Sequence, residues 1–279
     1  MYESTDPRDK IYAIAGLASD IGPGDIVPDY STPFENIYID FAESFLSKSL
    51  PGHELDFLGF AIRPSIDSEL LQYVPNKLPS WVPDWRVKLN IYPFHKHQID
   101  IQSDRIIGTV YNASKGTTVS AFVDNRALHI KGMVVDSIKL LSSDNTRREM
   151  FNILKSFWLP SNSSALYNPP HPETIEEAFL TTVTADTIDA SNDIMPIRPH
   201  SFDWNAIGNE RFTLDNQKLS IYASDVIEGM RKATYGRRFM WTEGGKIGLA
   251  PAAAGLGDKI SLFLGGQVLY VLRERGEGK

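Results

Sequence analysis

A basic cluster follows a strongly helical stretch and could act on a bound ligand. The sequence RKATYGRRF brings Arg237 and Arg238 close to Tyr235. Guanidinium and phenol groups donate hydrogen bonds that can polarise a carbonyl or hold a carboxylate. The ordinary alternative is a solvated helix end, whose cations interact with the helix dipole. Both interpretations stay open at this point.

A second group combines aromatic rings with an acid. The sequence LPSWVPDW places Trp81, Asp84 and Trp85 in a loop stiffened by proline. It is typical of a packing motif, and the functional alternative is an aromatic wall with a carboxylate at the edge of a pocket. His95 and His97 would share one face of an extended segment, but no third metal ligand is apparent and a solvated pair is favoured.

Signatures of familiar chemistry are absent from the sequence. The chain has no cysteine, which excludes thiolate nucleophiles, thiolate zinc sites and iron–sulfur clusters. GLGDKI lacks the third glycine of a dinucleotide-binding turn, and no GxxxxGK[ST] or GxSxG sequence occurs. HELDF is not HExxH, and the acids of TADTIDASND are typical of a polar loop. We therefore expect no cofactor and no metal.

Charge and hydropathy restrict the partners. The 279 residues carry a net charge of −7, which disfavours binding to nucleic acid or to an anionic membrane. No apolar run is long enough to span a membrane, and Asp6, Arg8, Asp9 and Lys10 interrupt any signal sequence. These features predict a soluble, cytoplasmic protein.

One class of reaction needs none of the missing groups. An intramolecular cycloaddition is accelerated when a flexible apolar substrate is folded into its reactive conformer, and a donor on a carbonyl activating group adds electrostatic stabilisation. The predicted carbonyl donor is one of His95, Tyr235, Arg237 and Arg238. The predicted substrate-binding wall draws on Trp81, Trp85, Tyr92, Phe94, Trp158, Trp204 and Trp241, with Asp84 at its edge.

Two functions from other classes remain as alternatives. The first is a non-catalytic protein-interaction or regulatory module, which would present an apolar surface and form dimers or complexes. The second is an acid–base isomerase or cyclase that uses a carboxylate among Asp84, Asp203 and Glu210. That enzyme would need a buried acid with a raised pKa.

Apolar residues at helical spacing predict the helices that must position these side chains. In DPRDKIYAIAGL, Asp6 is a predicted N-cap and Pro7 the first helical residue. Thr32 and Glu35 have the spacing of a capping box before the next helix. Gly236 is a predicted helix stop. The predicted helices cover residues 6–17, 31–49, 147–158, 172–183 and 216–236.

Strands are predicted in two regions. Residues 127–141 alternate and are rich in β-branched side chains, and residues 237–274 form three or four short strands separated by glycine turns. The C-terminal run predicts a small antiparallel, barrel-like sheet, so the fold class is α+β. Residues 76–118 and 159–215 are expected to be loops. We expect a helical part at 1–118 and a mixed part at 119–279, which together form one compact unit.

Several motifs resemble a known family. DPRDKIYAIAGL, IVPDYS and LPSWVPDW, in this order, resemble the second half of the fungal heterokaryon-incompatibility (HET) domain. LHIKGMVVDSI and the strand-rich C-terminal run resemble the region that follows that domain. The YxxLSYxWG-like and WIDxLCIxQ-like strands of the family's N-terminal part are absent. The chain thus resembles a truncated member.

The resemblance also implies a role. The missing part holds the family's most conspicuous motifs, so the cell-death function is not carried over. Recruitment to a fungal biosynthetic pathway is what the resemblance implies for a truncated member. There the cycloaddition would be a norbornene-forming Diels–Alder reaction on a terpenoid substrate. Surface left by the lost half would form a pocket or an oligomer interface.

Overall fold

The structure is a computed structural model in which eleven stretches are described. Those stretches are residues 4–15, 26–62, 78–87, 97–100, 105–109, 111–142, 175–185, 188–190, 193–195, 230 and 232–274. The chain divides into two compact units. Unit 1 contains Met1–Leu89, His95–Met133 and Leu262–Tyr270, and unit 2 contains Asn90–Phe94, Val134–Ser261 and Val271–Lys279. The domain bounds expected from the sequence stay a prediction.

Unit 1 begins with the helix expected from the first motif. Helix α1 covers Asp9–Ala15, after a turn at Pro7 and Arg8. The Oδ1 atom of Asp6 accepts a 2.9 Å hydrogen bond from the backbone N–H of Arg8. This contact closes the turn before the helix. Because α1 begins at Asp9, the expected first helical residue, Pro7, lies in that turn, and the N-cap role of Asp6 stays a prediction.

The second helix forms as expected, but its predicted cap is wrong. Helix α2 covers Phe34–Lys48, and its N-cap residue, Pro33, has no side chain that can cap it. The Thr32 hydroxyl instead donates to Oδ2 of Asp29 at 2.6 Å. Asp29 also accepts from the hydroxyl of Ser31 at 2.6 Å. These bonds orient the Thr32 and Ser31 hydroxyls toward Asp29, and the end of α2 has no side-chain cap.

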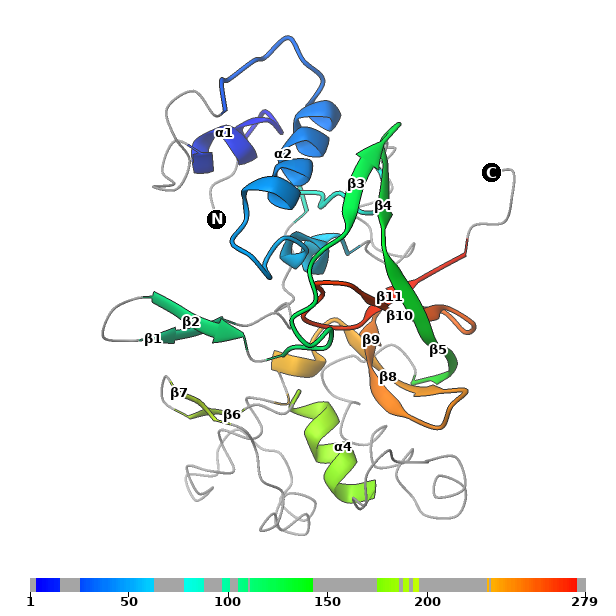
Figure 1. Ribbon diagram of the computed structural model, residues 1–279. Helices are drawn as coiled ribbons and strands as arrows, with labels where there is room; N and C mark the ends of the chain where they lie inside the picture. Colours follow the sequence, from blue (N-terminus) through cyan, green and yellow to red (C-terminus); the bar gives the residue numbers. More distant parts are fainter. Residues whose placement is uncertain are drawn as a thin grey trace. The chain divides into compact units, whose positions relative to one another are not determined.

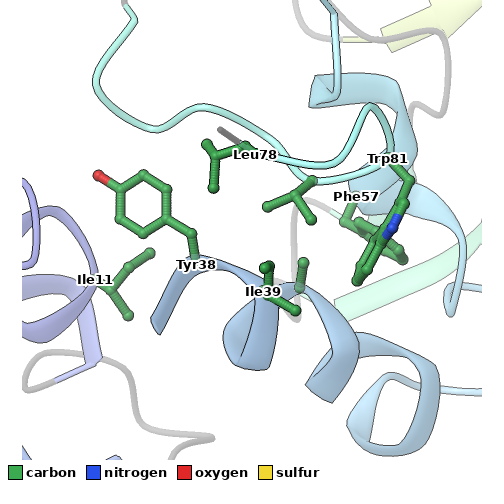
Figure 2. Close-up of a cluster of buried hydrophobic side chains, with 8 residues drawn as sticks. Ile11, Tyr38, Ile39, Phe57, Leu78 and Trp81 are labelled. Carbon is green, nitrogen blue, oxygen red and sulfur yellow. The ribbon is translucent and has the colours of Figure 1, made fainter. Parts of the chain in front are cut away.

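The core of unit 1 is built on the buried face of α2. Tyr38 and Ala42 are fully buried, and Ile39 lies beside them. Figure 2 shows Ile11 of α1, Leu78 and Trp81 of the loop at 78–87, and Phe57 converging on this face. Phe57 comes from the 3₁₀ helix η1 at Asp56–Phe60, which the sequence did not predict. The apolar residues of α2 are spaced so that they share one face, and the other side chains of the cluster pack on that face.

Two antiparallel strand pairs also belong to unit 1. Strands β1 (His97–Asp100) and β2 (Arg105–Thr109) pair inside the stretch expected to be a loop, so that expectation was wrong there. Strands β3 (Ala121–Asp124) and β4 (Ala127–Ile130) form a hairpin with alternating burial. Val123 and Leu128 of this hairpin pack against the core of unit 1.

The predicted C-terminal strands are confirmed. They are β8 (Arg237–Thr242), β9 (Ile247–Pro251), β10 (Lys259–Phe263) and β11 (Tyr270–Leu272). With β5 (Gly132–Leu141) they form a curled antiparallel sheet in the order β11-β10-β5-β8-β9 (Figure 1). The sheet resembles half a barrel, and with the helices it makes the fold α+β, as expected.

The two faces of β8 bury different side chains. Met240 packs with Ile138, Ala250 and Ile260 on one face. Phe239 and Trp241 lie on the other. Alternation along a strand accounts for this division. Helix α4, which covers Ile175–Val183, contributes to the second face through the two side chains Phe179 and Val183.

Other expectations fall partly or wholly outside the described residues. The helix expected at 147–158 lies outside them, as does most of the one at 216–236. Two short strands, β6 (Ile188–Ala190) and β7 (Asp193–Met195), pair inside the second stretch expected to be a loop, so that expectation was wrong there. No helix among the described residues is long and apolar enough to cross a membrane.

Candidate functional site

One face of β8 joins a cation to an aromatic cluster. Arg237, Phe239 and Trp241 alternate along the strand, so their side chains project from the same face. All three are buried, with Arg237 7% exposed. The rings of Phe239 and Trp241 meet edge to face at 4.9 Å, and Phe179 of α4 lies 5.5 Å from Phe239. An arginine that is always charged therefore borders a buried aromatic cluster.

The chain before β8 fixes the position of Arg237. Residues Lys232–Thr234 end a helical turn, and Gly236 adopts a φ of +69°. This left-handed residue confirms the predicted helix stop. Nη1 of Arg237 then donates to the carbonyl oxygen of Ala233 at 2.8 Å. The guanidinium thereby caps the helix end, which is the ordinary role that the sequence left open.

Arg238 projects from the opposite face of β8. Its Nε donates to the carbonyl oxygen of Ser142 at 2.7 Å, and its Nη1 to that of Ala254 at 3.3 Å. These bonds tie β8 to the end of β5 and to the loop after β9. Tyr235 is half-buried in the turn before β8. Of these three candidate donors, Arg237 lies on the face that carries Phe239 and Trp241.

The tryptophans of LPSWVPDW lie in the aromatic core of unit 1. Trp81 is 9% exposed, and its ring lies 6.3 Å from that of Phe57. The Trp85 ring meets those of Tyr38 and Phe41 at 5.0 and 5.3 Å. Edge-to-face pairs of this kind stabilise a core beyond the area they bury. The contacts fit a packing motif, and a part in substrate binding stays a prediction.

Asp84 is buried in a charged pair. Its two carboxylate oxygens accept hydrogen bonds from Nε and Nη2 of Arg86 at 2.8 and 2.7 Å. The Arg86 guanidinium also lies over the Phe34 ring, 4.6 Å from its centroid. A bidentate pair holds both groups in one geometry, so Asp84 orients the end of this loop against α2.

The first two family-like motifs contact each other directly. Arg8 of DPRDK donates to the carbonyl oxygens of Tyr30 and Thr32, just after IVPD. Tyr12 accepts from the backbone N–H of Asp29 at 3.0 Å and also bonds its carbonyl. The Tyr30 hydroxyl donates to Asp9 at 2.7 Å. These motifs therefore hold α1 to the segment before α2.

Several candidate residues lie outside the described part of the chain. They are Tyr92, Phe94, His95, Trp158 and Trp204, together with Asp203 and Glu210 of the acid–base alternative. Their predicted roles stay predictions. Two residues that sequence reasoning missed are Phe179, which joins the cluster on β8, and Arg126, whose carbonyl oxygen accepts from Trp81. The amphipathic pattern of 172–183 was the only signal for Phe179.

Hydrogen bonds lower the pKa values of several described carboxyl groups. Hydrogen bonds from Ser31 and Thr32 lower the pKa of Asp29 to about 2. The pKa of Asp6 is lowered by its hydrogen bonds with Arg8. Burial alone would raise the pKa values of Asp136 and Asp258, yet their hydrogen bonds lower both. Over the described residues, no group of three or more potential metal ligands is brought together.

Comparisons with known proteins do not identify the chain. No family model, no curated protein and no solved structure matches it. The resemblance to the heterokaryon-incompatibility family therefore rests on the quoted motifs alone, and it stays a prediction.

Proposed function

We propose that this protein is a cofactor-independent pericyclase of fungal secondary metabolism that descends from the heterokaryon-incompatibility family. It catalyses an intramolecular Diels–Alder cyclisation of an apolar terpenoid whose dienophile is activated by a carbonyl group, and the product contains a norbornene. It acts in the cytoplasm without metal or nucleotide. Its partner is the small-molecule substrate.

A single observation carries the proposal. Arg237 shares one face of β8 with Phe239 and Trp241. In a cycloaddition two C–C bonds form and no proton or electron is transferred, so the protein needs only to shape the substrate and stabilise charge on the activating carbonyl. An aromatic cluster next to the substrate would support the first task, and the guanidinium beside the buried rings of Phe239 and Trp241 would support the second.

The guanidinium suits this task for a physical reason. Electron density shifts toward the carbonyl oxygen of the dienophile as the transition state forms. A charged donor in a surrounding of low dielectric constant stabilises that density more strongly than water does. Ala233 fixes Nη1 of Arg237, so the guanidinium is already oriented before substrate binds. Preorganised donors of this kind typically contribute about 100- to 1000-fold to a rate.

The proposal is tested with purified protein treated with a metal chelator. Terpenoid diene–enals and the corresponding saturated aldehydes are screened by native mass spectrometry and thermal shift. A diene–enal that binds one per chain is then incubated, and the rate and stereochemistry of cyclisation are measured. Acceleration of one stereoisomer over the spontaneous mixture supports the proposal, and an unchanged product ratio at saturating protein contradicts it.

The interaction-module alternative has an observation in its favour. Three consecutive apolar residues of β5, Met133, Val134 and Val135, are 61%, 59% and 40% exposed. Exposed apolar side chains are a common mark of a protein interface, and here they lie on both faces of the strand. Light scattering after size exclusion distinguishes the pericyclase from the interaction module. A stable oligomer that the change Val134→Lys dissociates, together with no binding of terpenoids, favours the interaction module.

A further inference from the structure

Residues Leu262–Tyr270, which we call the strap, belong to unit 1 although they come from the far end of the chain. They include the last two residues of β10, the connection that follows, and the first residue of β11. The strap includes Gly265, Gly266 and Gln267, none of which belongs to the apolar core around Tyr38. The strap is therefore not held to unit 1 by the apolar cluster that packs α1 against α2.

Hydrogen bonds attach the strap to three separate segments of unit 1. The backbone N–H groups of Ala113 and Ser114 donate to the carbonyl oxygens of Gln267 and Gly266, both at 3.1 Å. The N–H of Gly265 donates to the Thr117 hydroxyl at 3.0 Å. Leu264 donates to the carbonyl oxygen of Lys131 at 3.0 Å.

Gln267 connects the strap to a segment that is distant in sequence. Its side-chain amide donates to the carbonyl oxygen of Gly52 at 2.7 Å, across 215 residues. Gln267 is 8% exposed, so this bond is shielded from water. Removing a donor from a buried bond leaves the carbonyl unpaired and costs more than an exposed bond would.

The strap also fits closely against the segment before β3. Gly265 has a φ of +79°, and a Cβ atom built there would lie 2.1 Å from Cγ2 of Val119. Only glycine accommodates both constraints. The rings of Phe263 and Tyr270 stack on each other at 4.8 Å, so the two ends of the strap are held together.

We propose that the strap is a conformational latch: it holds its neighbouring segments of unit 1 in place while it is docked. The side-chain hydrogen bond of Gln267 keeps it docked. Release of the strap frees residues 50–58 and 111–119 while the core around Tyr38 stays folded. The physical reason is that a local element held to its neighbours mainly by hydrogen bonds, and outside the apolar cluster around Tyr38, opens at lower free energy than that cluster. The inference is independent of the proposed function.

Hydrogen exchange followed by mass spectrometry on the full chain tests the latch. Gln267→Glu removes the amide donor and places a carboxylate against the carbonyl of Gly52. Gly265→Ala releases the strap by a different route. Glu274→Gln, an exposed change outside the strap, is the control.

We expect both strap variants to speed exchange at Ala113, Ser114 and residues 52–58 by about 10- to 100-fold, the effect of one lost buried hydrogen bond. Exchange of the α2 amides at Ile39 and Ala42 should match the control. Equal acceleration in α2, including global unfolding of either variant, would show that the strap is part of the core and overturn the proposal. Unchanged exchange at Ala113 and Ser114 would overturn it as well.

Discussion

The indole Nε1 of Trp81 donates a 3.0 Å hydrogen bond to the backbone carbonyl of Arg126, which lies 45 residues further along the chain. Arg126 adopts a φ of +64° in the turn between β3 and β4, a conformation that costs a residue with a Cβ about 1 kcal/mol. The turn thus aims its carbonyl at the buried tryptophan. This bond attaches the hairpin to the loop at 78–87.

Trp81→Phe should destabilise the protein by about 2–4 kcal/mol. The change leaves the Arg126 carbonyl without the indole donor and opens space beside Phe57. Urea unfolding measures the loss. Phe122→Leu, at a side chain that is 62% exposed on the same hairpin, should shift stability by less than about 1 kcal/mol. Equal effects of the two changes would refute the structural role given to Trp81.

The pair of Asp84 and Arg86 should be strongly coupled. Asp84→Asn leaves a partly buried guanidinium without its counter-charge, at a cost of about 2–4 kcal/mol. Replacing both partners, with Asp84→Asn and Arg86→Met, should cost less than the sum of the single changes. A double-mutant cycle with a coupling energy below about 0.5 kcal/mol would contradict the pairing.

Asp258 should make the stability of unit 2 depend on acid pH. Burial would raise its pKa, but hydrogen bonds from Arg273 and Gly255 lower it below 3.8. A group whose pKa is lower in the folded state stabilises the fold above its unfolded pKa, and that stabilisation disappears as the pH falls through the folded pKa. Its contribution should therefore be constant from pH 7 to about 5 and be lost below about pH 4.

Thermal unfolding of Asp258→Asn checks this sign. The variant should melt below the parent protein at pH 6, and the two melting temperatures should converge as the pH approaches 2. A difference that grows on acidification would contradict the assignment. Glu274→Gln provides a control at an exposed carboxyl near the same strand.

Arg8→Lys should loosen α1 without disturbing α2. Lysine keeps the charge but cannot make the paired bonds of Arg8 to the two oxygens of Asp6 while also reaching the Tyr30 and Thr32 carbonyls. Hydrogen exchange should therefore accelerate at Ile11 and Tyr12 and stay unchanged at Ile39. If the α1 amides exchange as slowly as in the parent, the contact between the first two motifs is not what holds this helix.

Sequence patterns predicted the elements whose signals are local and strong. Helices α1, α2 and α4 follow apolar spacing, and strands β8 to β11 follow glycine turns in a run rich in apolar residues. Strands β1, β2, β6 and β7 were missed because they lie in stretches rich in Pro, Asn, Asp and Ser, a composition typical of loops. Thr32 and Glu35 have the spacing of a capping box, but the Thr32 hydroxyl bonds to Asp29 and no side chain caps α2.

The candidate site was predictable only in part, because its arrangement depends on contacts distant in sequence. The pattern RRFMWT identified both arginines, and strand alternation then separates Arg237 from Arg238 once β8 is known. Nothing local indicated that Phe179 would join Phe239, or that Trp81 would bond Arg126. Such pairs follow from the tertiary fold.

The most direct test of the proposed function compares Arg237→Met with Arg238→Met in the cyclisation assay. Both changes remove a guanidinium from β8, and Lys139→Gln controls for loss of a surface cation; thermal unfolding confirms that each variant is folded. We predict that Arg237→Met lowers the single-turnover rate by about 100-fold, while Arg238→Met lowers it by less than about threefold. A folded Arg237→Met protein that cyclises the substrate at the parent rate and with the parent stereochemistry would contradict the account.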